Sequence, residues 1–452
     1  FQQKTGVAFD LVICDEAHRT TGVTLAGEDD SNFVRVHDNE YINAAKRLYM
    51  TATPRIYGDD SKKKAMDNSV LLCSMDDESI YGQEFYRLSF SEAVSQGLLS
   101  DYKVIVLAVD EEFVSRSLQK QLTDANNELT LDDAVKIVGC MNGLAKKTHF
   151  PGEEDYFSND PQPMRRAVAF TQTIDQSKKF VAMFEEIQAL YKINTSDGNS
   201  QTVELKHVDG KTNALERKNR IDWLKRDAGE DTCRVLSNAR CLSEGVDVPA
   251  LDAVMFLSPR SSIVDIIQSV GRVMRKSEGK KYGYIILPIG IPAGVEPEAA
   301  LTKNKKYEVV WNVLQALRAH DDRFNNTINR IELNKNKPDN ISIIGVTGFD
   351  EDVNTNSING NSDSYNGSQL AFDLTELNQW KNNIYAKIVK KCGSRQYWET
   401  WAKDIAEIAA RHITEIKVLI EQPEIAPKFE AFLDGLRHNL NPSIGKEDAI
   451  EM

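Results

Sequence analysis

Residues 9–22, FDLVICDEAHRTTG, place two carboxylates and a histidine directly behind a short apolar run. A run of this kind, bounded by polar residues, is typical of a buried strand. In an open parallel sheet, ligands lie at the carboxyl ends of the strands, and this strand ends at Asp15 and Glu16. The stretch therefore predicts a strand that delivers two acidic side chains to the edge where ligands bind.

Further short apolar runs follow along the chain and alternate with stretches of helical character. They are RLYMTA, YKVIVLAV, RRAVAFT, CRVLSN, DAVMFL and YGYIILP, which begin at residues 47, 102, 165, 233, 252 and 282. Such alternation is typical of parallel sheets covered by helices, so the sequence predicts an α/β fold. Residues 112–147 indicate helices inserted into this pattern, as a lid, a spacer or an arm.

The composition limits the classes of function. With 27% charged and 41% hydrophobic residues, and no apolar run long enough to span a bilayer, the 452 residues indicate a soluble protein without a membrane role. The net charge of −13 argues against a protein that coats nucleic acid through bulk positive charge. The six cysteines are scattered without CxxC pairs, which favours a reducing cytoplasm over a disulfide framework.

The two carboxylates after the first strand suit metal-dependent phosphoryl chemistry. Asp15 would hold Mg²⁺ through water, because magnesium keeps most of its hydration shell and needs few protein oxygens. Glu16 would orient and deprotonate an attacking water molecule. The alternative is a polar turn after a buried strand, without a chemical role.

A second strand, RLYMTA, ends near two hydroxyl side chains, Thr51 and Thr53. These hydroxyls either cap the turn before Pro54 or, together with the upstream acids, link the nucleotide state to movement of a neighbouring domain. His18 is their expected hydrogen-bond partner.

The stretch SSIVDIIQSVGRVMR, residues 261–275, predicts a helix with a capping box at its start. On this helix Gln268, Arg272 and Arg275 fall at i, i+4 and i+7, so they share one face. A glutamine and two arginines on one face suit a γ-phosphate and the charge that develops during its transfer. We assign Arg275 the role of arginine finger, Arg272 a neighbouring phosphate contact and Gln268 a hydrogen bond. A plain amphipathic surface helix is the alternative.

The stretch LSEGVDVP, residues 242–249, predicts a strand-to-loop turn that approaches a ligand closely. Gly245 permits the close approach, and Asp247 can accept a hydrogen bond from a ribose hydroxyl or from an arginine of the following helix. Ser243 is a candidate phosphate contact for a nucleic-acid strand.

Taken together and in this order, DEAH, TAT, AFTQT, SEGVDVP and QSVGRVMR resemble motifs II to VI of superfamily-two helicases and translocases. The resemblance covers about residues 1–290. It implies two RecA-like lobes with parallel sheets, ATP bound between them and nucleic acid across their tops. Ser243 stands where many relatives have threonine, a change that keeps the hydroxyl.

The family's phosphate-binding loop, GxxxxGK[ST], does not occur in the chain and would be expected before Asp15. VDGKTN at residues 208–213 is a tempting substitute, but the earlier glycine of the motif falls on Leu205. Its position matches a turn of the second lobe instead. We therefore expect an N-terminally truncated helicase with an incomplete first lobe and little ATP turnover of its own.

Residues 394–417 and 432–452 resemble the helical coupler that follows the motor in type ISP restriction-modification enzymes. This resemblance implies a bacterial, cytoplasmic motor that uses ATP and Mg²⁺ to move along double-stranded DNA. Its partners would be the nuclease and the methyltransferase and target-recognition domains of the same polypeptide or complex. The implied contacts with the DNA backbone are Thr171, Thr173, Ser243 and Arg260.

These observations also predict the order of segments along the chain. One segment, residues 334–369, is predicted to be a flexible linker. It is rich in Asn, Ser, Gly and Asp, so it has little apolar surface to offset the entropy of ordering. The segments are the end of the first lobe at 1–100, the second lobe at 101–292 with its helical insertion at 112–147, a helical connector at 293–333, the flexible linker at 334–369 and an all-α coupler domain at 370–452.

Two other functions fit part of the pattern. A strand-separating DNA or RNA helicase shares the motor motifs, and residues 112–147 would be its candidate separating element. A non-catalytic DNA-binding scaffold with a vestigial ATP site fits the missing phosphate loop. The retained acids of motif II and arginines of motif VI argue against such decay.

Overall fold

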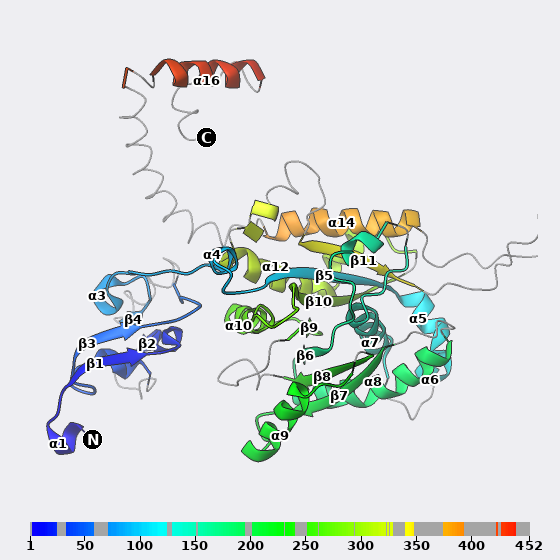
Figure 1. Cartoon of the computed structure of the whole chain (residues 1–452), viewed down its shortest axis with the longest axis horizontal. Coiled ribbons are helices and arrows are strands. Elements are labelled where there is room, and N and C mark those ends of the chain that lie inside the picture. Colours follow the sequence, from blue (N-terminus) through cyan, green and yellow to red (C-terminus); the bar gives the residue numbers. More distant parts are fainter. Residues whose placement is uncertain are drawn as a thin grey trace, which may run out of the picture. The chain divides into compact units, whose positions relative to one another are not determined.

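The chain divides into two compact units, a small unit of residues 1–83 with 393–452 and a large unit of residues 84–392 (Figure 1). The computed structural model describes residues 2–24, 33–57, 71–123, 129–150, 152–194, 201–229, 231–239, 251–260, 262–292, 294–321, 323–324, 326–328, 340–347, 374–392, 422–423 and 426–439.

The large unit is built on a seven-stranded sheet in the order β11-β5-β10-β9-β6-β8-β7, with all neighbours parallel. Five of the apolar runs form strands here, as predicted. The sheet also contains β7 and β11, which were not predicted. The strands are β5 (Asp101–Asp110), β6 (Arg166–Phe170), β7 (Thr202–Val208), β8 (Thr232–Asn238), β9 (Ala253–Phe256), β10 (Tyr282–Ile291) and β11 (Ile341–Val346).

Helices cover both faces of this sheet (Figure 1). Successive residues of β5 enter two different apolar clusters, because side chains alternate across a strand. Val104 and Val106 pack in the cluster with α10 (Ile263–Val273), α12 (Glu308–His320) and α14 (Leu374–Cys392), and Ile105 and Leu107 in the cluster with α7 (Leu131–Leu144) and α8 (Ile174–Asn194). The other helices are α4 (Phe90–Ser95), α5 (Glu111–Ser117), α6 (Gln119–Thr123), α9 (Ala214–Lys225) and α11 (Pro297–Lys303), with 3-10 turns η3 (Glu154–Tyr156) and η4 (Lys305–Tyr307).

The helices predicted as an insertion at 112–147 form part of the lobe itself. α7 lies on β5 and β10, and its glycines allow this close approach. A Cβ at Gly139 would lie 2.8 Å from Pro288 Cβ, and one at Gly143 would lie 2.7 Å from Leu107 Cδ1. The prediction of a helical insertion is therefore wrong for α7, which lies between β5 and β6 along the chain and packs on the sheet.

The prediction of a flexible linker at 334–369 is wrong for residues 341–346, because these residues form β11 at the edge of the sheet. All six residues of this strand are buried. The backbone groups on its open edge are bonded by side chains: Glu153 Oε1 accepts from Gly345 N at 3.0 Å, and Tyr385 Oη donates to the carbonyl oxygen of Ile341 at 3.2 Å. Apolar burial and these side-chain partners explain why a strand forms beside a polar stretch.

The helix α14, predicted as the start of the coupler domain, belongs to the large unit. It packs on α11 and α12, and Trp380 is fully buried in the same apolar cluster. Lys381 Nζ forms a buried ion pair with Glu153 Oε1 at 2.5 Å. Removing one partner of such a pair leaves an uncompensated buried charge, so the pair fixes α14 on the lobe.

His320 at the end of α12 predicts a loss of stability in acid. Burial, with the positive charge of Arg87 as the smaller cause, lowers the pKa of its imidazole from 6.5 to about 4. Below pH 6.5 the unfolded chain takes up a proton that the folded chain does not, so stability falls as the pH drops from 6.5 through 4. We expect the urea unfolding free energy of the large unit to decrease by about 2 kcal/mol from this group between pH 7 and pH 5.

The measurement is urea titration followed by tryptophan fluorescence, to which the buried Trp311 and Trp380 contribute. His320→Gln, which cannot be protonated in this range, should flatten this part of the pH dependence. An unchanged pH dependence in the glutamine variant would contradict the assignment.

The described part of the small unit contains two pairs of strands. β1 (Phe9–Cys14) pairs in parallel with β3 (Ala44–Tyr49), and β2 (Gly22–Thr24) pairs antiparallel with β4 (Leu71–Cys73). The runs FDLVIC and RLYMTA are thus confirmed as strands, the second only as far as Tyr49. The expectation that the first strand is buried is wrong, because Phe9, Leu11 and Ile13 are exposed. The described helices and 3-10 turns of this unit are α1 (Gln2–Thr5), η1 (Ala17–Thr20), η2 (Val34–His37), α3 (Glu78–Tyr81) and α16 (Ala426–Asn439).

Two further predictions concern the whole chain. Cys14, Cys73, Cys140 and Cys233 are buried and carry free thiols, as expected of small apolar side chains. Among the helices that the structure describes, none is both long and apolar enough to cross a bilayer.

Candidate functional site

The acidic turn after β1 is held against the neighbouring strand by backbone hydrogen bonds. Met50 N donates to the carbonyl oxygen of Cys14, and Ala17 N donates to that of Met50, both at 2.9 Å. Between these bonds Glu16 adopts a left-handed conformation, with φ 50° and ψ 45°. This conformation costs a residue with a Cβ about 1 kcal/mol or more, so the surrounding bonds maintain an unfavourable backbone geometry.

His18 connects this acidic turn to the two threonines after β3. Its Nδ1 lies 3.3 Å from Glu16 Oε2, 3.0 Å from Thr51 Oγ1 and 3.5 Å from Thr53 Oγ1. Thr53 N also donates to Thr51 Oγ1 at 3.1 Å. The predicted contact between His18 and the threonine pair is confirmed, and it places a carboxylate, an imidazole and two hydroxyls in one continuous chain.

A second histidine, His37, braces the same turn and was not predicted. Its Nε2 donates to the carbonyl oxygen of Thr20 at 3.0 Å, so its Nδ1 accepts from Tyr49 Oη at 2.8 Å. Burial lowers the pKa of His37, which favours this neutral form. No spacing in the sequence relates His37 to the acidic turn, because the contact depends on the pairing of β1 with β3.

Asp15 is suited to a hydrated magnesium ion. Its side chain is exposed at the end of β1, and one carboxylate oxygen accepts from Glu16 N at 2.9 Å. Mg²⁺ usually keeps several waters and takes one or two carboxylates with the phosphates of its substrate. In the described ranges no three His, Cys, Asp or Glu side chains gather into a metal cage, so any ion here would rely on Asp15, water and phosphate oxygens.

The predicted motif VI helix is α10, which begins as expected. Ser262 Oγ accepts from Asp265 N at 3.2 Å, and the apolar residues of the inner face are buried. Gln268 and Arg272, one turn apart, are half-buried. α10 nevertheless ends at Val273, so the prediction that Arg275 lies on the same helix face is wrong.

Arg275 instead lies in an isolated antiparallel bridge with Leu99, and its side chain is exposed. The helix stops because the next backbone groups bond outside it: Ser100 N donates to the carbonyl oxygen of Met274 at 2.8 Å. The arginine of the proposed finger is thus presented by a bridge, not by a helical turn.

The two threonines of the motif IV loop follow β6. Thr171 is buried, and its hydroxyl donates to the carbonyl oxygen of Thr173 at 3.0 Å. Thr173 is exposed, and its Oγ1 accepts from Gln176 N at 3.2 Å at the start of α8. The exposed Thr173 is therefore available to a ligand. The buried Thr171 stabilises the loop through its hydrogen bond to the backbone of Thr173.

Arg260 was predicted to contact DNA, but its side chain is only 8% exposed. The guanidinium forms an ion pair with Asp265 at 3.3 Å, donates to the carbonyl oxygen of Ala239 and lies 4.4 Å from the centre of the Phe170 ring. These contacts hold the start of α10 against β6 and β8. Arg260 thus serves packing within the lobe, because all sides of its guanidinium meet protein. The motif V residues Ser243, Gly245 and Asp247 lie outside the described residues.

The GKT sequence at residues 210–212, which resembles the end of a phosphate-binding loop, forms a turn, as predicted. Asp209 Oδ1 accepts from Lys211 N at 2.9 Å and from Thr212 N at 2.8 Å. His207 donates to the same carboxylate and, with the bonds from Thr212 and Lys211, lowers the pKa of Asp209 to about 2. The lysine and threonine backbone groups are thereby engaged by a carboxylate, which leaves no cradle for a phosphate.

A buried polar chain behind this turn was not predicted. Ser177 Oγ lies 2.7 Å from His207 Nδ1 and 2.7 Å from Ser237 Oγ. Because these residues belong to α8, β7 and β8, the chain fixes the three elements next to the motif IV loop. Both serines are fully buried, which restricts them to a structural role.

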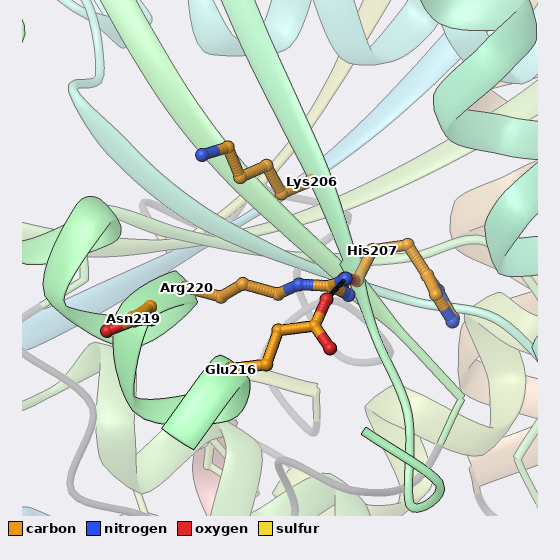
Figure 2. Close-up of a pocket in the computed structure, with 5 residues that line it drawn as sticks. All are labelled: Lys206, His207, Glu216, Asn219 and Arg220. Atoms are coloured by element: carbon orange, nitrogen blue, oxygen red, sulfur yellow. Dashed lines mark hydrogen bonds and ion pairs between the residues drawn. The ribbon is translucent and has the colours of Figure 1, made fainter. Parts of the chain in front are cut away.

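A pocket of about 440 Å³ lies between β7 and α9 (Figure 2). Arg220 donates to the carboxylate of Glu216 and to the carbonyl oxygen of His207, so protein groups balance its positive charge. The other lining residues are Lys206 and Asn219. None of the predicted site residues lines this pocket, and we assign it no function.

Comparison with protein families identifies three segments. Residues 1–56 match the type III restriction enzyme res subunit, residues 155–277 match the helicase conserved C-terminal domain, and residues 397–452 match the coupler domain of type ISP restriction-modification enzymes.

Solved structures and curated proteins agree with these matches. The structure of the ATP-dependent type ISP restriction-modification enzyme LlaBIII bound to DNA is 43% identical in sequence and matches with a TM-score of 0.70. The matched region covers 100% of this chain and 28% of the LlaBIII chain. A probable helicase of African swine fever virus is 26% identical over 322 residues, or 70% of this chain and 30% of the relative. The endonuclease subunit of the type I restriction enzyme EcoAI from Escherichia coli is 24% identical over 187 residues, or 40% and 20%. The chain thus spans less than a third of the length of each of these relatives.

Proposed function

We propose a function from the resemblance of this chain, along its whole length, to the motor and coupler region of type ISP restriction-modification enzymes. The chain would be an ATP-driven motor that moves along double-stranded DNA in a bacterial restriction-modification enzyme. The observation that carries the proposal is the chain of contacts from Glu16 through His18 to Thr51 at the ends of two paired parallel strands. It joins the candidate catalytic base, in the turn after β1, to the candidate coupling residues, in the segment after β3.

The side chains of the small unit would act on water and on the nucleotide. Glu16 would accept the proton of the attacking water, and its contact with His18 orients the carboxylate for this task. Asp15 would hold magnesium, which when bound neutralises phosphate charge. Thr51 and Thr53 share one hydrogen-bond partner, His18, so displacement of the imidazole would alter both threonines.

The side chains of the large unit would act on phosphate and on DNA. Arg275 would stabilise the charge of the transition state, with Arg272 as a second phosphate contact and Gln268 as a hydrogen-bond partner. Gly245 and Asp247 would contact the nucleotide. Thr173 and Ser243 would contact the DNA backbone, which gives a grip that is independent of sequence. The roles of Ser243, Gly245 and Asp247 follow from the motifs alone, and those of the other residues from the motifs together with the positions described above.

Two properties of the complete enzyme follow from the proposal. The 452 residues contain no GxxxxGK[ST] loop, so we expect hydrolysis to require a complete motor and the chain alone to turn over little ATP. The nuclease, methyltransferase and target-recognition functions would be carried by further domains, to which residues 397–452 would be joined as a coupler.

The experiment is a comparison of duplex movement with strand separation. A complete motor that carries this segment should displace a third-strand oligonucleotide from duplex DNA with ATP, while leaving the two strands of a forked duplex paired. Glu16→Gln should abolish displacement and keep DNA binding. Separation of the fork without stimulation of ATP hydrolysis by duplex DNA would favour a strand-separating helicase. DNA binding without any hydrolysis by the complete chain would favour a scaffold.

A further inference from the structure

Lys280 lies just before β10 and makes three contacts with backbone carbonyl oxygens. Its Nζ donates to the oxygen of Leu251 at 2.5 Å, to that of Arg275 at 3.0 Å and to that of Val273. Val273 is the last residue of α10, and Arg275 is the candidate arginine finger. A single ammonium group therefore ties the end of the motif VI helix to Leu251, two residues before β9.

The backbone around Arg275 is also restrained by other groups. The oxygen of Met274, between the two carbonyls bound by Lys280, accepts from Ser100 N at 2.8 Å, and Arg275 pairs with Leu99. Three consecutive carbonyl groups are therefore bonded. β10 approaches this segment so closely that a Cβ on Gly283 would lie 2.5 Å from the oxygen of Val273. Little freedom remains for the backbone that presents Arg275.

The charge of Lys280 suits this position. The carbonyl groups at the end of a helix carry partial negative charge, and a cation there satisfies bonds that the helix leaves open. Burial lowers the pKa of Lys280 to about 8, while the negative charge of Asp252 opposes that shift. A lysine on the surface would avoid this desolvation, so the position of the ammonium group has a cost that its three contacts offset.

We propose that Lys280 is a positioning residue for Arg275: it fixes the backbone from Val273 to Arg275, so that the guanidinium reaches the γ-phosphate in one orientation. This inference rests on the proposed function, because it assumes that Arg275 contacts the nucleotide. The ammonium group of Lys280 donates to three protein carbonyl groups.

The test is made in a complete motor with Lys280→Met, which keeps the length of the side chain and removes the donors. We expect kcat for DNA-stimulated ATP hydrolysis to fall about 100-fold, as for other misplaced catalytic groups, with the KM for ATP and the Kd for DNA little changed. Lys281→Met is the matched control. Its Nζ donates to the oxygen of Asn159 at 2.8 Å, away from α10, so kcat should stay at the parental value.

A double-mutant cycle separates positioning from a general structural role. If Lys280 acts through Arg275, adding Lys280→Met to Arg275→Ala should lower kcat no further than Arg275→Ala alone. Multiplied losses, or parental kcat in Lys280→Met, would overturn the inference. Parental kcat in Arg275→Ala would instead overturn the role of Arg275 in the proposed function. Should Lys280→Met fail to fold, Lys280→Gln, which keeps an N–H donor, carries the same cycle.

Discussion

Replacing Glu16 with glutamine in a complete motor should lower kcat for DNA-stimulated ATP hydrolysis by about 100-fold or more. The glutamine side chain has the same shape but cannot accept the proton of water as a carboxylate does. Its amide can occupy the same place beside His18, and the left-handed backbone at this position is unchanged in cost. The loss should therefore appear in kcat rather than in folding or in DNA binding.

The measurement is steady-state ATP hydrolysis with saturating duplex DNA, together with a titration of DNA binding. Asp10→Asn is the matched control, because Asp10 is an exposed acid at the other end of β1. This control should keep the parental kcat. Hydrolysis at the parental rate by Glu16→Gln would show that another group activates the water.

Replacing Arg275 with alanine should lower kcat by about 1,000-fold, the lower end of the range for arginine fingers. The guanidinium presents paired donors to phosphate oxygens, and alanine removes both the charge and this geometry. Arg275→Lys should recover only part of the loss, because an ammonium group cannot bind in the same forked manner. The KM for ATP should change less than kcat, because the charge that Arg275 meets develops in the transition state.

Lys276→Ala provides the control for this prediction, since Lys276 is the next residue and is also an exposed cation. It tests whether general positive charge near the bridge is enough. Equal losses in Lys276→Ala and Arg275→Ala would contradict a specific role for Arg275. Loss of DNA binding in Arg275→Ala would place this residue at the nucleic acid instead of the nucleotide.

Much of the fold could be predicted from local sequence, because its signals are local. A buried parallel strand needs a continuous apolar run, and five of the seven runs form mainly buried strands of the large sheet. The other two form β1 and β3, whose residues are mostly exposed or only partly buried. The start of α10 could be predicted because Ser262 and Asp265 are three residues apart, which is the spacing of a cap. The resemblance to superfamily-two helicases rests on short, ordered motifs, and the resemblance to type ISP enzymes on the helical segments at 394–417 and 432–452. The similarity to LlaBIII and the match of the coupler model confirm the second resemblance.

The tertiary structure decided where polar and charged side chains are used. Arginine is a residue type that often contacts DNA phosphates, so Arg260 was a candidate. In the folded lobe, however, Asp265 and Phe170 enclose its guanidinium. β11 follows a polar stretch, and it becomes a strand because β5 offers an open edge and Glu153 and Tyr385 bond its outer side. Neither outcome depends on neighbours in the sequence.

The sequence by itself determined which residues are candidates for the chemistry, since the motifs contain Glu16, His18 and Arg275 in a fixed order. Only the tertiary structure decided how they are held: the left-handed turn of Glu16 depends on bonds to β3, and Arg275 leaves its helix because Ser100 and Lys280 bind the carbonyls that end it. The physical reason is that side-chain identity is a local property, whereas backbone position is set by hydrogen bonds between segments far apart in sequence.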